Sequence, residues 1–351
     1  KLEELFDRHE SYYKEKKDYK TRPMTIFNNF IKRDIINKGL MNKNKARVLD
    51  MACGRLGDLD KYVSNNIDML LGIDVSMDGL MNYNGGGAIR LLKYGKFIND
   101  VEKKEITKKL IKKSLLIHGD VGRNISNGDA CFDELNRYYI DVLYGRHKPQ
   151  NGKLKSLYGM ALNQFHLVVC NFAIHYMLDN EEKLHEFLLN IQQNLKDQGY
   201  FIGTCQDGKT ILKMMGKSIV LEKRIDDDLV VKIEREDEMV NFEDNSYGQK
   251  ILYSTETFYE SQENLVDMDL FISECAKFDL KLIDTKMFLD DTDNMLNKFI
   301  KEKPKIGVEI ENTPEFLDVL SYHRWFIFQK VDGLNDYDFD NNNIKKEDND
   351  N

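Results

Sequence analysis

The chain has 351 residues, of which 41% are hydrophobic and 32% are charged, so it has room for one large core or a core with a small lobe. It lacks the apolar run of about 18–20 residues that spans a bilayer, and its charged first twenty residues do not resemble a secretory signal. A net charge of −9 argues against indiscriminate nucleic-acid binding. The five cysteines show no CxxC pair and no metal-ligand spacing, so we expect buried thiols in a reducing intracellular compartment and no metal site.

Charge is spread unevenly along the chain. The segment from Lys93 to Lys113 holds eight lysines and three acidic residues, which indicates either a solvated helix face or a local track for an RNA backbone. Residues 332–351 hold seven acidic and two basic residues in an Asn- and Asp-rich context, which predicts a disordered acidic tail.

The first half of the chain predicts helices and a parallel strand pair. We expect a charged surface helix over 1–20 and a second helix over 21–41, where apolar residues recur at helical spacing. Short apolar strands over 47–50 and 68–74 enclose a small-residue turn and a helix that begins at about Asp58. Strand, turn, helix and strand within about thirty residues form a βαβ unit.

The second half extends this pattern and then changes it. Further strands are expected over 115–118, 165–170 and 200–204, with a helix over 181–195, which predicts a doubly wound, mostly parallel α/β sheet. Strands over 219–221, 230–234 and 250–253 and a helix over 268–278 follow, before a closing strand over 323–328. We therefore expect one domain over 21–331 with a small β/α lobe inserted at about 210–300.

The turn after the first strand indicates a nucleotide-type cofactor. Its small residues, Ala52, Gly54 and Gly57, permit close approach of a ligand to the backbone. Asp74 ends the second strand, where a carboxylate can accept hydrogen bonds from both ribose hydroxyls. Asp120, after the third strand, is a candidate acceptor for an adenine amino group or, alternatively, a turn cap.

A nicotinamide dinucleotide would fit the same small-residue turn. However, Asp50 and Asp58 flank the turn, and carboxylates repel a pyrophosphate while they suit a sulfonium and an α-ammonium group. This charge argument favours S-adenosylmethionine.

Several longer motifs, in the right order, resemble those of mRNA cap guanine-N7 methyltransferases over roughly residues 22–330. The matching segments are IFNNFIK at 26–32, VLDMACGRLGDL at 48–59, GID at 72–74, NFAIHY at 171–176, GYFIGTCQD at 199–207 and QENLV at 262–266. The long insert around 138–144 resembles the enzymes of large DNA viruses more than the cellular ones. The resemblance implies a Rossmann-like class I methyltransferase fold whose inserted lobe binds the cap.

The resemblance also implies roles for particular residues. Its cofactor contacts correspond to Lys32, Ala52, Asp58, Asp74, Asp120, Asn171 and Tyr176. Its cap contacts correspond to Asn28, His175, Tyr176 and Glu263, with Tyr322 or His323 closing the pocket. Guanine N7 has a free lone pair, so the family needs no catalytic base and no metal, and acts by proximity and orientation.

The sequence departs from the family pattern at three of these places. Ala52 replaces the first loop glycine, Asn171 replaces a glutamine, and Gln206 replaces the proline before Asp207. Simpler interpretations also stay open: His175 and Tyr176 as packing residues, and Glu263 as an acid in the first turn of a helix.

The expected partner is capped RNA, with triphosphatase and guanylyltransferase domains upstream or a stimulatory subunit as further partners, and no membrane. A viral protein of this kind would act in a cytoplasmic factory or virion, and a cellular one in the nucleus. Two alternatives remain: a non-catalytic RNA-binding subunit with this fold, and a methyltransferase for another RNA or a small molecule.

Overall fold

The computed structural model describes residues 19–332 except 44, 151, 236–241, 243–245 and 293. The helix expected over 1–20 and the tail expected over 332–351 therefore lie almost wholly outside the described residues. Within the described part of the chain, no helix combines the length and the apolarity needed to cross a membrane.

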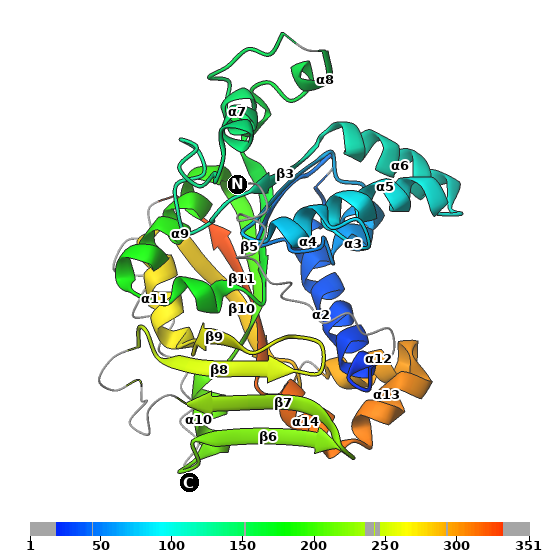
Figure 1. Cartoon of the computed structure of the whole chain (residues 1–351), viewed down its shortest axis with the longest axis vertical. Coiled ribbons are helices and arrows are strands. Elements are labelled where there is room, and N and C mark those ends of the chain that lie inside the picture. The colour runs from blue at the N-terminus through cyan, green and yellow to red at the C-terminus, as the bar shows by residue number, and fades with distance from the viewer. Residues whose placement is uncertain are drawn as a thin grey trace, which may run out of the picture.

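A seven-stranded sheet forms the centre of the molecule (Figure 1), in the order β10-β11-β5-β4-β1-β2-β3. Strands β1 to β5 run parallel, whereas β11 is antiparallel to both of its neighbours. The strands are β1 (Arg47–Met51), β2 (Met69–Asp74), β3 (Ser114–His118), β4 (Phe165–Asn171), β5 (Leu195–Gln206), β10 (Leu280–Met287) and β11 (His323–Lys330). This order reverses at β1, and ligands of doubly wound sheets bind where the order reverses.

Helices cover both faces of this sheet, because alternate strand residues point to opposite sides. On one side Val48, Leu70 and Ile202 share a core with α2 (Arg22–Leu40), and on the other side Leu49, Leu71 and Phe201 share a second core with α9 (Glu181–Asn194). The helices on the α2 side also include α3 (Leu59–Ser64), α4 (Met77–Met81), α5 (Gly87–Phe97) and α6 (Val101–Lys112). The elements on the α9 side also include α7 (Glu134–Leu143), α8 (Gly152–Lys155), η1 (Met160–Asn163), η2 (Ile174–Met177) and α11 (Met268–Lys277).

A smaller antiparallel sheet is inserted between β5 and β10. Its order is β6-β7-β8-β9, with the strands β6 (Val220–Ile225), β7 (Asp228–Arg235), β8 (Lys250–Thr255) and β9 (Ser261–Asn264). The adjoining helices are α10 (Gly208–Met215), α12 (Met295–Glu302), α13 (Pro304–Glu311) and α14 (Pro314–Ser321). Val231, Ile233 and Ile251 of this sheet join the α2-side core, so the lobe is packed onto the domain.

The structure confirms the predicted fold class, a doubly wound and mostly parallel α/β sheet. The predicted strands and the helices over 21–41, 181–195 and 268–278 agree with the observed ones to within a few residues, except that β5 begins earlier. The sequence did not predict α12 to α14, which are short helices of eight residues each. Short amphipathic helices give too few turns for a clear periodicity.

Candidate functional site

The turn between β1 and α3 is held in an unusual backbone conformation. Ala52 has φ 60° and Gly54 has φ 50°, both in the left-handed region. A residue with a Cβ carries a cost of about 1–2 kcal/mol there, which explains why glycine is the usual residue at the position of Ala52. The Cys53 amide donates to the Ile73 carbonyl at 3.0 Å and fixes the turn against β2.

Asp74, at the end of β2, fixes this turn through hydrogen bonds to backbone amides. Its carboxylate accepts from the Gly54 amide at 2.6 Å and from the Ser76 amide at 2.8 Å. Burial raises the pKa of Asp74, while the two amides oppose that shift because they stabilise the charged form. Each carboxylate oxygen can accept a second hydrogen bond, so Asp74 retains acceptor capacity for a ligand.

Asp58 lies at the N-terminus of α3, in a buried ionic cluster. Its carboxylate is 2.9 Å from the Lys32 ammonium and 2.9 Å from the Lys61 ammonium, and it accepts from the Asn171 amide at 3.0 Å. Burial alone would raise the pKa of Asp58, but the two ammonium groups hold it well below its usual range. The cluster joins α2, α3 and β4, so three of the predicted cofactor residues are in direct contact.

Asp50 has the opposite environment, although it is only eight residues away. Its carboxyl group accepts from the Tyr62 hydroxyl at 2.8 Å inside the protein. Burial and the nearby charge of Asp58 raise the pKa of Asp50 to about 8, so Asp50 is mostly uncharged at neutral pH. By sequence alone, both Asp50 and Asp58 count as charges beside the cofactor, whereas burial favours the protonated form of Asp50 and Asp58 is paired with two lysines.

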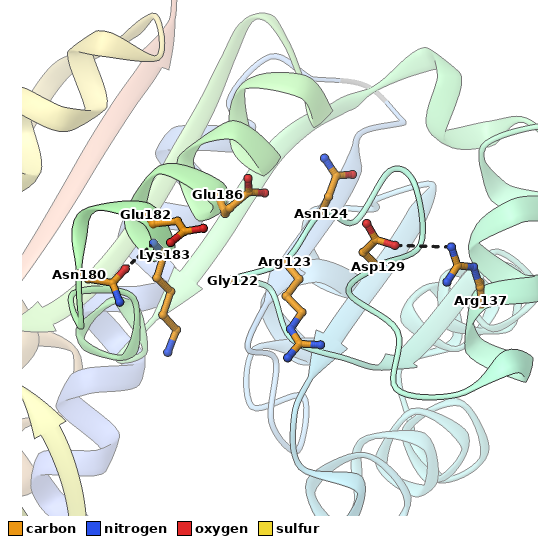
Figure 2. A pocket seen from close by; sticks show the side chains of 9 residues that line it. All are labelled: Gly122, Arg123, Asn124, Asp129, Arg137, Asn180, Glu182, Lys183 and Glu186. Carbon is orange, nitrogen blue, oxygen red and sulfur yellow. Dashed lines mark hydrogen bonds and ion pairs between the residues drawn. The ribbon is translucent and has the colours of Figure 1, made fainter.

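Asp120 follows β3 and caps a local turn, because its Oδ1 accepts from the Gly122 amide at 2.8 Å. Beside this turn lies a surface hollow of about 600 Å³ (Figure 2). Its charged lining residues have both signs: Arg123, Arg137, Lys183, Asp129, Glu182 and Glu186. These charges partly compensate one another, as in the 3.5 Å contact of Arg137 with Asp129, so we assign no ligand to this hollow.

Glu263 and His175 meet in the interior between the two sheets. Glu263 lies on β9 and is 2% exposed, and its Oε2 is 3.5 Å from Nε2 of His175 in η2. That distance is an electrostatic contact rather than a hydrogen bond. Burial lowers the pKa of His175 more than Glu263 raises it, so the imidazole is neutral. The interpretation of Glu263 as a first-turn helix acid is wrong, because β9 ends before α11 begins.

The two candidates for closing the pocket differ in their neighbours. Tyr322, just after α14, is fully buried within electrostatic reach of Glu263 and beside Tyr253 of β8. His323, at the start of β11, packs its ring against Phe172 and Phe288, with ring centroids 5.1 and 5.4 Å apart. Burial lowers the pKa of His323 to about 3. Tyr322 therefore borders the same space as Glu263, and His323 belongs to an aromatic cluster beside it.

Other buried polar atoms of the site lack protein partners. Among the described residues, neither the Oδ1 of Asn28 on α2 nor the two ring nitrogens of His175 has a hydrogen-bond partner. Such atoms are costly unless a ligand or water satisfies them. The ring of Tyr176 lies beside that of His175, with centroids 4.1 Å apart and planes tilted by 58°, so a ligand bound there would meet an aromatic ring as well as polar atoms.

The structure also adds residues that the sequence alone did not single out. Lys61 shares Asp58 with Lys32, and Thr204 donates to the Asn171 side chain at 3.2 Å. Asn264 donates to the His175 carbonyl at 2.9 Å and to Asp179 at 3.2 Å, which ties β9 to η2. Asn264 directly follows Glu263 in QENLV and Lys61 lies three residues after Asp58, so sequence position could have suggested both. The contact of Thr204 with Asn171 arises instead from the pairing of β4 with β5.

Comparisons with known proteins agree with this geometry. The mRNA (guanine-N(7))-methyltransferase domain family matches residues 4–83 and 141–311. A probable mRNA-capping enzyme of Acanthamoeba polyphaga mimivirus is 27% identical over 208 residues, 58% of this chain and 16% of that protein. The mRNA cap guanine-N(7) methyltransferase 1 of Arabidopsis thaliana is 24% identical over 299 residues, 84% of this chain and 64% of that protein.

The mRNA cap guanine-N(7) methyltransferase of Saccharomyces cerevisiae is 26% identical over 287 residues, 80% of this chain and 54% of that protein. The chain thus spans less than two thirds of the length of each of these relatives. The family match covers well over half of the chain, in two segments that carry Asp58, Asp74, His175 and Glu263. The chain therefore belongs to the mRNA (guanine-N(7))-methyltransferase domain family.

Proposed function

We propose that this chain transfers a methyl group from S-adenosylmethionine to guanine N7 of a GpppN cap on RNA. The observation that carries the proposal is the position of Glu263. This buried carboxylate on β9 of the inserted sheet lies 3.5 Å from Nε2 of His175 in η2, and Tyr322 is within electrostatic reach of it. The family match supports the same reaction.

The residues at the carboxyl ends of β1, β2 and β4 fit the cofactor. Asp74 would accept from the ribose hydroxyls, Asp120 from the adenine, and the Ala52–Gly54 turn would lie against the amino-acid part. Lys32, Asp58 and Asn171 form one connected cluster, in which Asn171 and Lys32 hold the Asp58 carboxylate in place. Asp58 can then accept from the α-ammonium group, and the surplus lysine charge of the cluster can pair with the α-carboxylate.

We place the guanine of the cap between the two sheets, where Glu263 and His175 meet. A carboxylate that accepts from the guanine N1–H and from the exocyclic amine would select guanine, and such bidentate contacts are worth about 1–3 kcal/mol of discrimination. Glu263 is the carboxylate in this space. Asn28, His175 and Tyr176 would supply further polar and aromatic contacts, and we assign the closing position to Tyr322.

The reaction needs orientation rather than proton transfer. S-adenosylmethionine supplies an electrophilic methyl group when it is bound. Guanine N7 attacks with its own lone pair, so no residue has to remove a proton, and correct placement of the reactants can supply several kcal/mol of the barrier. As the methyl group bonds to N7 the guanine ring becomes cationic, and the negative charge of Glu263 stabilises that cation.

The direct test is to follow a labelled methyl group. The chain is incubated with labelled S-adenosylmethionine and GpppA-capped RNA, and the RNA is then digested to nucleotides. We expect the label in 7-methylguanosine from the cap. Label in an internal nucleotide, or none on RNA while a small molecule is methylated, would contradict the proposal.

Glu263→Gln tests the guanine contact itself. The variant keeps the shape of the side chain but replaces one acceptor with a donor that faces a donor, so we expect the rate on GpppA-capped RNA to fall at least tenfold, about 1.4 kcal/mol. Affinity for S-adenosylmethionine should stay near that of the wild type. Glu260→Gln, an exposed residue just before the same strand, is the matched control. If the Glu263→Gln variant methylated capped RNA at the wild-type rate, Glu263 would not be the residue that contacts guanine.

We also propose that the chain acts beside other cap-forming activities in a reducing intracellular compartment. The support is the similarity to a mimivirus protein named as a probable mRNA-capping enzyme. Triphosphatase and guanylyltransferase domains would produce the GpppN end that this chain methylates. Co-purification of such activities with the chain from its natural source would test this proposal.

A further inference from the structure

Helices α5 and α6 present a row of lysines to solvent. We call the exposed side chains of Lys93, Lys96, Lys108, Lys109 and Lys112 the lysine face. Lys108 pairs with Glu105 at 2.6 Å, and no described carboxylate lies within 4.0 Å of the other four ammonium groups. In a chain with a net charge of −9, this concentration of unpaired positive charge attracts polyanions.

Apolar side chains are exposed within the lysine face. Phe97 is 66% exposed and Leu92 is 54% exposed, and the Lys96 ammonium lies 5.2 Å from the centre of the Phe97 ring. Exposed aromatic rings among basic residues are the stacking platforms on which single-stranded nucleic acids bind. A face that only kept the protein soluble would not need them.

The lysine face is attached directly to the candidate cofactor turn. A Cβ at Gly87, the first residue of α5, would lie 3.5 Å from the Gly54 carbonyl oxygen, and the Arg90 guanidinium donates to the Leu56 carbonyl at 3.4 Å. The two helices pack on each other through Gly95, whose Cβ would lie 3.0 Å from Ile111. Figure 1 shows α5 and α6 extending outward beside α4, at the β3 edge of the main sheet and away from the small sheet.

This segment also lies outside the residues that the family match covers. The family match ends at residue 83 and resumes at residue 141, so α5 and α6 lie wholly within the unmatched interval. The lysine face is therefore not among the segments on which the family assignment rests.

We infer that the lysine face binds the body of the RNA, downstream of the cap, through phosphate contacts and base stacking. The inference rests on the proposed function, because it takes the cap to be held beside the same turn. Phosphate contacts hold the strand without sequence preference, so the RNA body would raise the affinity for capped transcripts over free cap dinucleotides. Phe97 and Leu92 would contact the bases of the bound strand.

The test compares two substrates and two variants of the full chain. One variant carries Lys93→Glu, Lys96→Glu, Lys109→Glu and Lys112→Glu. The control variant carries the same charge change at four exposed lysines outside the lysine face. These changes are Lys213→Glu in α10, Lys217→Glu just after α10, Lys301→Glu in α12 and Lys305→Glu in α13. The substrates are free GpppA and a GpppA-capped RNA of about 20 nucleotides, longer than the 4–16 nucleotides of typical single-strand sites.

The lysine-face variant should show at least a tenfold higher KM for the capped RNA, with KM and kcat for free GpppA unchanged. Each lost phosphate contact should lower the salt slope of log Kd by about 0.7, so the slope should fall by about 2–3 for four lysines. Equal losses in the control variant, or an unchanged KM for capped RNA, would overturn the inference. Equal losses on free GpppA would assign these lysines to the site itself.

Binding of uncapped RNA of the same length, measured by fluorescence anisotropy, separates this inference from the proposed function. If wild-type chain binds uncapped RNA but methylates neither substrate, the reaction is wrong and the surface assignment stands. If it methylates free GpppA and binds uncapped RNA no better than the lysine-face variant does, the reaction stands and the surface assignment fails.

Discussion

The charge state of each acidic residue at the site depends on its neighbours. Asp50 and Asp58 flank one short turn, yet burial raises the pKa of Asp50 to about 8, while Lys32 and Lys61 keep Asp58 ionised. Desolvation favours the protonated form of Asp50, whereas Lys32 and Lys61 stabilise the ionised form of Asp58. Residue type alone therefore overstates the negative charge of the turn.

This difference predicts a pH-dependent stability. The folded pKa of Asp50 lies above its unfolded value of 3.8, so its contribution is fully present below that value and is lost as the pH rises toward about 8. Between about pH 4 and pH 8 the free energy of unfolding should therefore fall as the pH rises. Asp50→Asn, which cannot ionise, should remove this slope from the free energy of unfolding measured in denaturant.

Asp227→Asn, an exposed change, is the control for Asp50 and should leave the slope as it is. A wild-type slope that survives in Asp50→Asn would show that another group titrates, and Asp50 would then be ionised at neutral pH.

Asp74→Ala should weaken the cofactor and the turn together. Loss of the acceptor for ribose should reduce S-adenosylmethionine affinity by about 1.5–3 kcal/mol. The structure adds a second effect, because the Gly54 and Ser76 amides lose their common acceptor. A lower melting temperature should therefore accompany the weaker binding. If isothermal calorimetry gave the Asp74→Ala variant the wild-type Kd for S-adenosylmethionine, Asp74 would not be the acceptor for the ribose.

At the scale of elements, the site depends on how the inserted sheet is attached to the main one. Glu263 lies on β9 and His175 lies in η2, and they are neighbours only because the lobe packs against the end of β4. Asn264 makes this connection, since its amide donates to the His175 carbonyl and to Asp179. Asn264 thus positions β9, the strand that also carries Glu263.

Asn264→Ala tests that attachment. It leaves the buried His175 carbonyl without a donor, which costs about 1–3 kcal/mol of stability. We expect a larger KM for capped RNA and a smaller kcat, with S-adenosylmethionine affinity nearly unchanged because Asp74 lies on a separate element. Gln262→Ala, an exposed neighbour on the same strand, is the control. Equal effects on cofactor and cap would indicate general loosening instead.

At the scale of the whole molecule, cofactor choice can be read from folding stability. A ligand that binds only the folded state stabilises it by about 2.7 kcal/mol at 100 times its Kd. S-adenosylmethionine and its demethylated product should therefore raise the melting temperature, and NAD should not. The comparison matters because the turn by itself resembles a dinucleotide site. If NAD alone raised the melting temperature, the assignment of S-adenosylmethionine as the cofactor would be contradicted.

The sequence by itself determined the βαβ pattern, the succession of the main strands along the chain and the choice of candidate residues. These follow from local periodicity, from small residues in the turn and from motifs such as NFAIHY, all of which are contiguous in the chain. It could not determine the charge of Asp50, the sharing of Asp58 by Lys32 and Lys61, or the choice between Tyr322 and His323. Each of these depends on burial, and several depend on residues far apart in sequence, such as Lys32 and Asp58 or His175 and Glu263. Ionisation and pocket geometry are set by the local dielectric and by contacts across elements, and only the tertiary structure brings those groups together.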